Sequence, residues 1–330
     1  MRNLITDVPG IRVGHADDQA LASGLTAIVF DAPATASIAI HGGAPGVRDT
    51  ALLEPEMTVE AVDALVLSGG SAFGLDAMGG AMAALAAMGR GFAVGPTHVP
   101  IVPGAVLFDL NNGGDKAWGR QPPYWEFGHA AVKAATLDFA LGSVGAGLGA
   151  TTADLKGGLG SASAVTTRGY AVGAIAAVNA LGQATVGDGP HFWAAPYERE
   201  GEFGGLGLPR FDRSGAPIFR TKGTAPQNTT ICIVAIDAVL TKAQCKRLAV
   251  VAQDGLALAL RPAHAALDGD VVFAVATGLN PRPVTTGDLT EIGALAAETL
   301  ARAVARGIYE ASALPFPNAL PSWQGKFGRG

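Results

Sequence analysis

The chain has 330 residues, of which 49% are hydrophobic and only 15% are charged, and its formal net charge is −5. Its longest apolar runs, such as residues 81–88, are far shorter than the roughly 20 residues of a membrane-spanning helix. Its Lys and Arg residues are scattered and do not form the clusters that phosphate contacts require. We therefore expect no membrane or nucleic-acid partner, and a homo-oligomer whose interfaces bury much of the apolar surface.

The first half of the chain predicts short strands and two helices. Strands are expected at residues 26–30, 37–40 and 64–67, with a break between the first two at Asp31-Ala32-Pro33. Helical spacing of apolar residues follows at 75–88 and 127–140, and residues 99–107 are expected to be extended.

The second half predicts the remaining strands and helices. Residues 142–160 are mostly small, a strand at 170–178 ends at Asn179, and residues 190–223 are expected to form a surface loop. Strands at 231–236 and 271–275 alternate with helices at 241–260, capped by Thr241, and at 286–305, and the tail after Ser312 is expected to wrap the surface. Since strict βαβ alternation is missing, we predict one α/β domain with sheet packed on sheet and helices outside.

The junction between Asn228 and Thr229 is the most informative feature. A polar, Pro-marked loop ends at Asn228, and a β-branched run begins at Thr229. Cleavage of this bond would give Thr229 a free α-amine beside its hydroxyl, which is the chemistry of an N-terminal threonine nucleophile. The same residues also suit an ordinary strand entry or an N-glycosylation sequon.

Two loops rich in small residues carry alternative interpretations. Residues 68–74 (SGGSAFG) fit neither the G-x-G-x-x-G nor the G-x-S-x-G pattern, so they predict either a tight strand-to-helix turn or an anion site made of backbone amides. Lys156 stands among small uncharged residues. Burial there would lower its pKa and suit it to proton transfer, whereas a snorkelling side chain would leave it in solvent.

Other polar residues stand at strand ends. Asp268 and Asp270 precede the strand at 271–275 and predict either a turn or an acid pair with unequal pKa values. Asn179 is expected to cap its strand or to donate its amide to an oxyanion. The six histidines show no metal-ligand spacing, so we expect no metal and no other cofactor.

The two cysteines and the N-terminal residues indicate in which cellular compartment the protein is expected. Cys232 lies in an apolar run and Cys245 on a predicted helix, which is typical of reduced thiols in the cytosol. Residues 1–7 contain no apolar signal segment. We expect a cytoplasmic protein, which weakens the glycosylation interpretation of Asn228.

Taken together, seven segments resemble the P1 family of peptidases, the group of L-aminopeptidase/D-esterase, β-peptidyl aminopeptidases and nylon-oligomer hydrolases. In chain order these are residues 5–15, 42–46, 67–75, 156–163, 228–230, 254–257 and 261–264. The junction of Asn228 with Thr229 and the pair Asp268 and Asp270 resemble the threonine-using nylon-oligomer hydrolase branch more than the serine-using aminopeptidases.

The resemblance implies a fold, a processing step and roles for site residues. The fold would be a single αββα sandwich like that of N-terminal-nucleophile hydrolases. The chain would cut itself into residues 1–228 and 229–330 and assemble as a tetramer. Thr229 would be the nucleophile, Asn179 would hold the oxyanion, and Lys156, paired with Asp268 or Asp270, would position the amine. The substrate would be a small-molecule or short-peptide amide, such as an aminohexanoate oligomer.

Two other functions stay open from the sequence. An acyltransferase of the ornithine acetyltransferase type would use the same nucleophile with an amine as acceptor. An unprocessed homologue that only binds small molecules would keep a single uncut chain and show no amidase activity.

Overall fold

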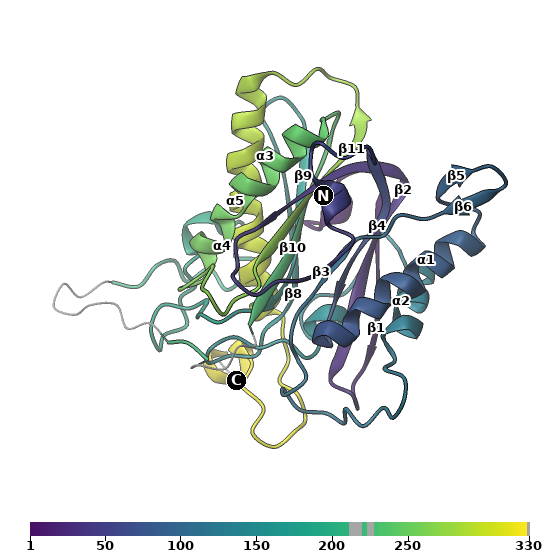
Figure 1. Ribbon diagram of the computed structural model, residues 1–330. Helices are drawn as coiled ribbons and strands as arrows, with labels where there is room; N and C mark the ends of the chain where they lie inside the picture. The colour runs from purple at the N-terminus through teal and green to yellow at the C-terminus, as the bar shows by residue number, and fades with distance from the viewer. Residues whose placement is uncertain (211–219, 223–227, 329–330) are drawn as a thin grey trace.

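The computed structural model describes residues 1–210, 220–222 and 228–328. Within them, nine strands form one hydrogen-bonded sheet: β1 (Ile11–Asp18), β2 (Ser23–Ile40), β3 (Gly46–Arg48), β4 (Ala61–Ser68), β7 (Gly104–Val106), β8 (Gly158–Val165), β9 (Ala171–Asn179), β10 (Thr229–Ala238) and β11 (Val271–Asn280). Their order is β3-β7-β4-β2-β11-β10-β9-β8, and β1 pairs with β2. A separate hairpin of β5 (Phe92–Val94) and β6 (Thr97–Val99) projects from one side (Figure 1).

Helices cover the two outer faces of this sheet. They are α1 (Ala77–Ala87), α2 (Tyr124–Lys133), α3 (Lys242–Ala252), α4 (Asp254–Ala259), α5 (Thr286–Tyr309) and the short α6 (Trp323–Phe327). Figure 1 shows α1 and α2 together on one side of the molecule and α3, α4 and α5 on the other. None of the helices in the described part of the chain is both long and apolar enough to cross a membrane.

Alternating side chains show that the sheet folds into two packed layers. On β10, Ile231 and Ile233 face a core shared with Ile28 of β2, whereas Cys232 and Val234 face the core beneath α3 and α5. The same alternation on β2 and β4 separates that shared core from the one beneath α1 and α2. The predicted αββα sandwich is therefore confirmed.

The predicted break near Pro33 is wrong, because β2 runs without interruption from Ser23 to Ile40. Asp31, Ala32 and Pro33 are exposed, and the register between β2 and β4 shifts between Val29 and Ala34. A Pro is tolerated at such an irregular position because it does not have to donate a ladder hydrogen bond there.

Most predicted helices are present with changed ends. Residues 71–76 form a 3-10 helix before α1, and α2 begins at Tyr124 and ends at Lys133 instead of spanning 127–140. The helix predicted at 241–260 is interrupted at Gln253, whose buried side chain donates to the Ala39 carbonyl at 2.8 Å. Thr241 caps α3 as predicted, but α5 is capped by Thr285. Strand β8, which begins at the end of the region of small residues and continues to Val165, was not predicted.

The region predicted to be a surface loop is partly buried. Phe192 and Phe203 pack against each other with ring centroids 5.4 Å apart, and both contribute to the core beneath α5. Trp323 of the C-terminal tail stacks on Phe192. Residues 211–219, and residues 223–227 just before Asn228, lie outside the described part of the chain.

Strand pairing brings three separate segments to one edge. Strand β10 runs antiparallel to β9, which places Thr229 opposite Asn179, the last residue of β9. Strand β11 runs parallel to β10, with Val271 opposite Ile231, so that the residues before β11 lie beside residues 228–230. The candidate site is built where these strands begin and end.

Candidate active site

The bond between Asn228 and Thr229 is buried and closely contacted. The Thr229 side-chain oxygen Oγ1 donates to the Asn228 carbonyl oxygen at 2.5 Å. The backbone N–H of Gly269 donates to the same carbonyl oxygen at 2.9 Å. A hydroxyl therefore touches the carbonyl group of the preceding peptide bond, and a second donor from another segment polarises that group.

Asp270 holds the backbone just after this junction and the backbone of a separate segment at His264. Its carboxylate is buried, with Oδ1 accepting the Thr230 N–H at 3.0 Å and Oδ2 accepting the His264 N–H at 2.9 Å. The imidazole Nδ1 of His264 lies 3.0 Å from Oδ2. Burial alone would lower the pKa of His264, but its hydrogen bond and charge interaction with Asp270 outweigh burial and raise that pKa.

Asp268 is the second acid, and its environment differs. Burial first, and the charge of Asp270 second, raise the pKa of its carboxyl well above the ordinary value. Asn228 and Asp268 also form a parallel bridge between their backbones. Asp268 and Asp270 therefore lie in unequal environments, and acid–base catalysis commonly relies on two carboxyls of this kind.

Asn179 lies beside the nucleophile candidate with its amide held from both ends. Its Nδ2 donates to the Phe108 carbonyl at 2.9 Å, and its Oδ1 accepts the Thr151 N–H at 3.0 Å. The side chain is fully buried. This arrangement fixes the orientation of the amide next to the start of β10.

Lys156 is close to the site, but the predicted pairing with an aspartate is wrong. Its Nζ donates to three backbone carbonyls, those of Gly147 at 2.9 Å and of Ala150 and Gly157 at 2.8 Å. Burial lowers the pKa of Lys156 to about 7, while the charge of Asp109 acts in the opposite direction. Three carbonyls satisfy all three N–H donors of an ammonium, so Lys156 fixes the loop at 147–157 from within.

Lys222 is a site residue that sequence reasoning missed. Its Nζ donates to the Asn179 carbonyl at 3.2 Å and to Asn179 Oδ1 at 3.1 Å. Burial lowers the pKa of Lys222 to about 7, against the opposing charge of Asp268. The sequence around Lys222 shows no strand or helix periodicity from which the direction of its side chain could be predicted. The only signal in the sequence is its position six residues before Asn228.

The first three backbone amides after Ser68 in the SGGSAFG loop donate hydrogen bonds to other parts of the protein. The N–H of Gly69 donates to Gly24, that of Gly70 to Asp109 Oδ1 and that of Ser71 to Leu107. Gly70 has a φ of 83°, which favours glycine in a tight turn. The turn interpretation is therefore supported, and these three amides are not available for an anion.

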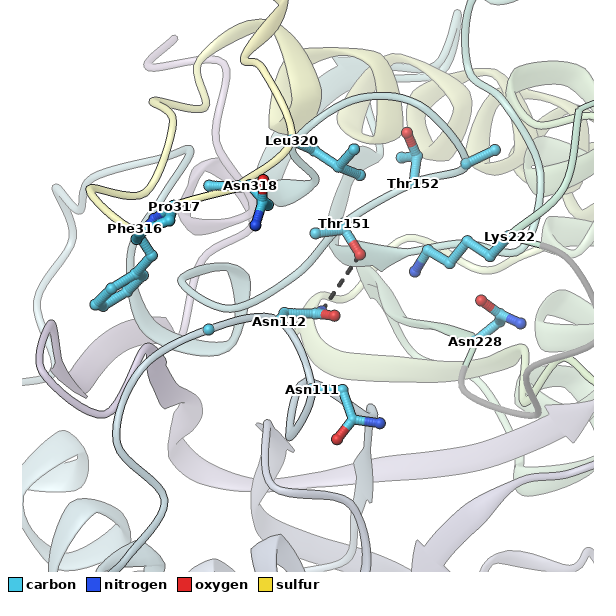
Figure 2. A pocket seen from close by; sticks show the side chains of 13 residues that line it. Asn111, Asn112, Thr151, Thr152, Lys222, Asn228, Phe316, Pro317, Asn318 and Leu320 are labelled. Carbon is cyan, nitrogen blue, oxygen red and sulfur yellow. Dashed lines mark hydrogen bonds between the residues drawn. The ribbon is translucent and has the colours of Figure 1, made fainter.

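Two cavities flank the junction, and Asn228 lines both. The larger, of about 520 Å³, is shown in Figure 2, and its polar lining includes Asn111, Asn112, Thr151, Lys222, Asn228 and Asn318. The smaller, of about 260 Å³, contains Thr229 and has a mostly apolar wall that includes Leu75, Val106 and Phe108. A substrate reaching Thr229 therefore meets one polar and one apolar cavity.

The sequence matches the model of Peptidase family S58 over residues 3–319. The chain belongs to peptidase family S58. It is 43% identical to an uncharacterized aminopeptidase of Mycobacterium tuberculosis, with 99% of each chain covered. It is also 25% identical to a 6-aminohexanoate-oligomer endohydrolase of Kocuria sp., covering 90% of this chain and 84% of that protein.

Solved structures agree with the S58 assignment at the level of the fold. A Burkholderia sp. beta-aminopeptidase superposes with a TM-score of 0.71 at 22% identity, covering 99% of this chain and 92% of the other. The L-aminopeptidase D-Ala-esterase/amidase of Ochrobactrum anthropi, described as a variant of the Ntn hydrolase fold, gives 0.70 at 20% identity and covers 97% and 90%. The predicted family is confirmed, and this S58 member is a hydrolase of peptide or amide bonds.

Proposed function

We propose that this S58 hydrolase cleaves its own Asn228–Thr229 bond and then uses the new N-terminal Thr229 as its nucleophile. The observation that carries the proposal is the convergence of Thr229 Oγ1, at 2.5 Å, and the Gly269 N–H, at 2.9 Å, on the Asn228 carbonyl oxygen. The products would be chains of residues 1–228 and 229–330.

The first step is an N→O acyl shift. Thr229 Oγ attacks the Asn228 carbonyl carbon, and the Gly269 N–H stabilises the negative charge that develops on the carbonyl oxygen. Collapse of this intermediate breaks the C–N bond, passes a proton to the Thr229 nitrogen and leaves Asn228 joined to Thr229 Oγ as an ester. Water hydrolyses the ester, which gives a carboxylate on Asn228 and restores the Thr229 hydroxyl beside the amine that the acyl shift freed.

The mature enzyme uses the freed amine as its base. The Thr229 amine accepts the proton of Oγ, and Oγ attacks the carbonyl carbon of the substrate amide. The protonated amine then donates its proton to the leaving amine, and water releases the acyl group from Oγ. No organic cofactor or metal enters these steps.

The surrounding residues position the reacting groups. Asp270 fixes the start of β10 through the Thr230 N–H, and Asn179 presents its amide across the strand pair. Asp268 supplies a second carboxyl of raised pKa at the turn that carries Gly269. Lys156 fixes the loop at 147–157 through three carbonyls.

The substrate proposed for this site is a short peptide or a small oligomeric amide. The relatives support both classes, since one group is named as aminopeptidases and another as 6-aminohexanoate-oligomer endohydrolases. The family match favours hydrolysis over the acetyl transfer to glutamate that an ornithine acetyltransferase would perform.

The test compares two neighbouring threonines. Thr229→Val removes the proposed nucleophile with little change of shape and should leave a single uncut chain without amidase activity. Thr230→Val is the matched control, because the Thr230 hydroxyl is buried and makes no hydrogen bond within the described residues. The control should give both fragments and hydrolyse alanine p-nitroanilide or the 6-aminohexanoate dimer.

Three results would count against the proposal. A Thr229→Val protein that is cut or active would exclude Thr229 as the nucleophile. A wild-type protein that stays uncut would favour a small-molecule-binding role. Turnover of acetylornithine that requires added glutamate would favour the acyltransferase.

A further inference from the structure

Charge is distributed unevenly in the cavities beside the nucleophile candidate. Lys222 is the sole charged side chain that lines either cavity within the described part of the chain. The rest of the polar wall of the larger cavity consists of uncharged amide and hydroxyl groups, such as Asn112, Thr151 and Asn318. A volume of about 520 Å³ is within the range of small-molecule sites.

The ammonium of Lys222 faces this cavity. Figure 2 shows its nitrogen at the end of the side chain directed toward Thr151 and Asn112, across the open space from Asn318. Asn179 is its acceptor through two atoms, which occupy at most two of the three donors of an ammonium. A donor is thus left for a ligand in the cavity.

The environment of Lys222 is costly for a charge without a partner. The side chain is half-buried, and burial lowers its pKa. Within the described residues, its hydrogen-bond acceptors are the neutral oxygens of Asn179 and not a carboxylate. The charge of Asp268 acts on Lys222 without a hydrogen bond between them in the described residues. A ligand carboxylate would add a counter-charge that is hydrogen-bonded directly, and a hydrogen bond between two ionised groups is about twice as strong as a neutral one.

We propose that the larger cavity binds a carboxylate of the substrate through Lys222, and that the enzyme therefore prefers amides that carry a free carboxylate. This inference rests on the proposed function and narrows its substrate class. The geometry also disfavours recognition of a free substrate amine in these cavities, because no acidic side chain of the described residues lines them.

The experiment measures binding, so that it does not depend on turnover. The probes are 6-acetamidohexanoate and 6-acetamidohexanamide, which differ only in a carboxylate against a carboxamide. Each is titrated by calorimetry into wild-type protein and into the Lys222→Gln, Lys222→Arg and Lys133→Gln variants. Lys133→Gln makes the same change of net charge at an exposed residue at the end of α2.

The expected result is binding of the carboxylate about tenfold or more tighter than the carboxamide in wild type. Lys222→Arg and Lys133→Gln should keep this preference, and Lys222→Gln should lose it. Equal binding of the two probes to wild type, no binding of either, or a preference that survives Lys222→Gln would overturn the proposal. If the Lys222→Gln protein does not fold, the affinities of the wild-type protein for the two probes alone decide whether the cavity prefers a carboxylate.

Intact mass of the same wild-type sample separates this inference from the proposed function. A single uncut chain refutes self-processing, whatever the probes show. Two chains without a carboxylate preference refute the role of Lys222 alone.

Discussion

Gly269 donates its backbone N–H to the carbonyl oxygen of Asn228 at 2.9 Å, across the parallel pairing of β10 and β11. The Thr229 hydroxyl contacts the same oxygen from within its own strand. One peptide bond is thus held between the proposed nucleophile and a backbone N–H donor, which come from segments about 40 residues apart. This relationship connects the strand order of an S58 fold to the chemistry proposed for it.

Gly269→Ala should slow self-cleavage. An added Cβ would lie 2.6 Å from Thr229 Oγ1 and 2.8 Å from the Ala44 carbonyl, so the hydroxyl must move. Because a misplacement of about 1 Å can reduce a rate about 100-fold, we expect slowing of that order. The measurement is a time course of the uncut chain on denaturing gels. Gly287→Ala, which meets only a side chain 3.7 Å away, should cleave at the wild-type rate, and equal rates for both variants would contradict the account.

Asp270→Asn should lower both stability and cleavage rate. An Asn keeps one acceptor oxygen, so the backbone N–H of Thr230 or His264 loses its partner, which costs about 1–3 kcal/mol. Urea unfolding and the cleavage time course measure the two effects. Asp237→Asn is the control, because Asp237 accepts the Ala171 N–H at 3.0 Å on the far part of β10. It should destabilise the protein and leave cleavage unchanged, whereas slow cleavage in both variants would indicate a general loss of stability.

His264→Gln should change the pH dependence of stability. Since Asp270 raises the pKa of His264 in the folded protein, this contribution is fully present below the unfolded pKa of about 6.5 and is lost as the pH rises through the folded value. The groups that face His264 are Asp270, Asp268, His41 and the Gln253 carbonyl. The difference in Tm between wild type and variant should therefore be larger at pH 5.5 than at pH 9. A difference that is constant or larger at pH 9 would contradict the assigned interaction.

Lys156→Met should destabilise the protein and slow cleavage together. It removes three donors from the carbonyls of Gly147, Ala150 and Gly157, at about 1–3 kcal/mol for each acceptor left without a partner. Lys242→Met is a matched control, because this buried lysine also donates to two carbonyls, at 3.0 and 2.8 Å, but away from the site. Thermal denaturation should show a loss in both variants, and only Lys156→Met should slow cleavage. Normal cleavage in a folded Lys156→Met protein would remove Lys156 from the site.

Strand patterns allowed much of the fold and part of the site to be predicted. Asn179 and Thr229 were expected at the end of one strand and near the start of another, and antiparallel pairing places them opposite each other. The position of Asp270 near Thr230 has the same origin, because β11 runs parallel to β10 and starts beside Thr230. The continuity of β2 was missed because a local Pro signal does not show that a register shift can absorb it.

The hydrogen-bond partners of Lys156 and Lys222 could not be predicted from the sequence. A long flexible side chain can reach carbonyls or carboxylates several ångströms apart, and no local pattern fixes its direction. Lys156 accordingly contacts three carbonyls instead of an aspartate. Lys222 lies in an irregular region without periodicity, so its contact with Asn179 became visible only in three dimensions.

The most direct test of the central claim is N-terminal sequencing, with intact mass, of the purified wild-type protein. We predict two chains, of which the smaller begins Thr229-Thr230-Ile231 and ends at Gly330. One chain of 330 residues after prolonged incubation, or a smaller fragment that begins at any other residue, would contradict it.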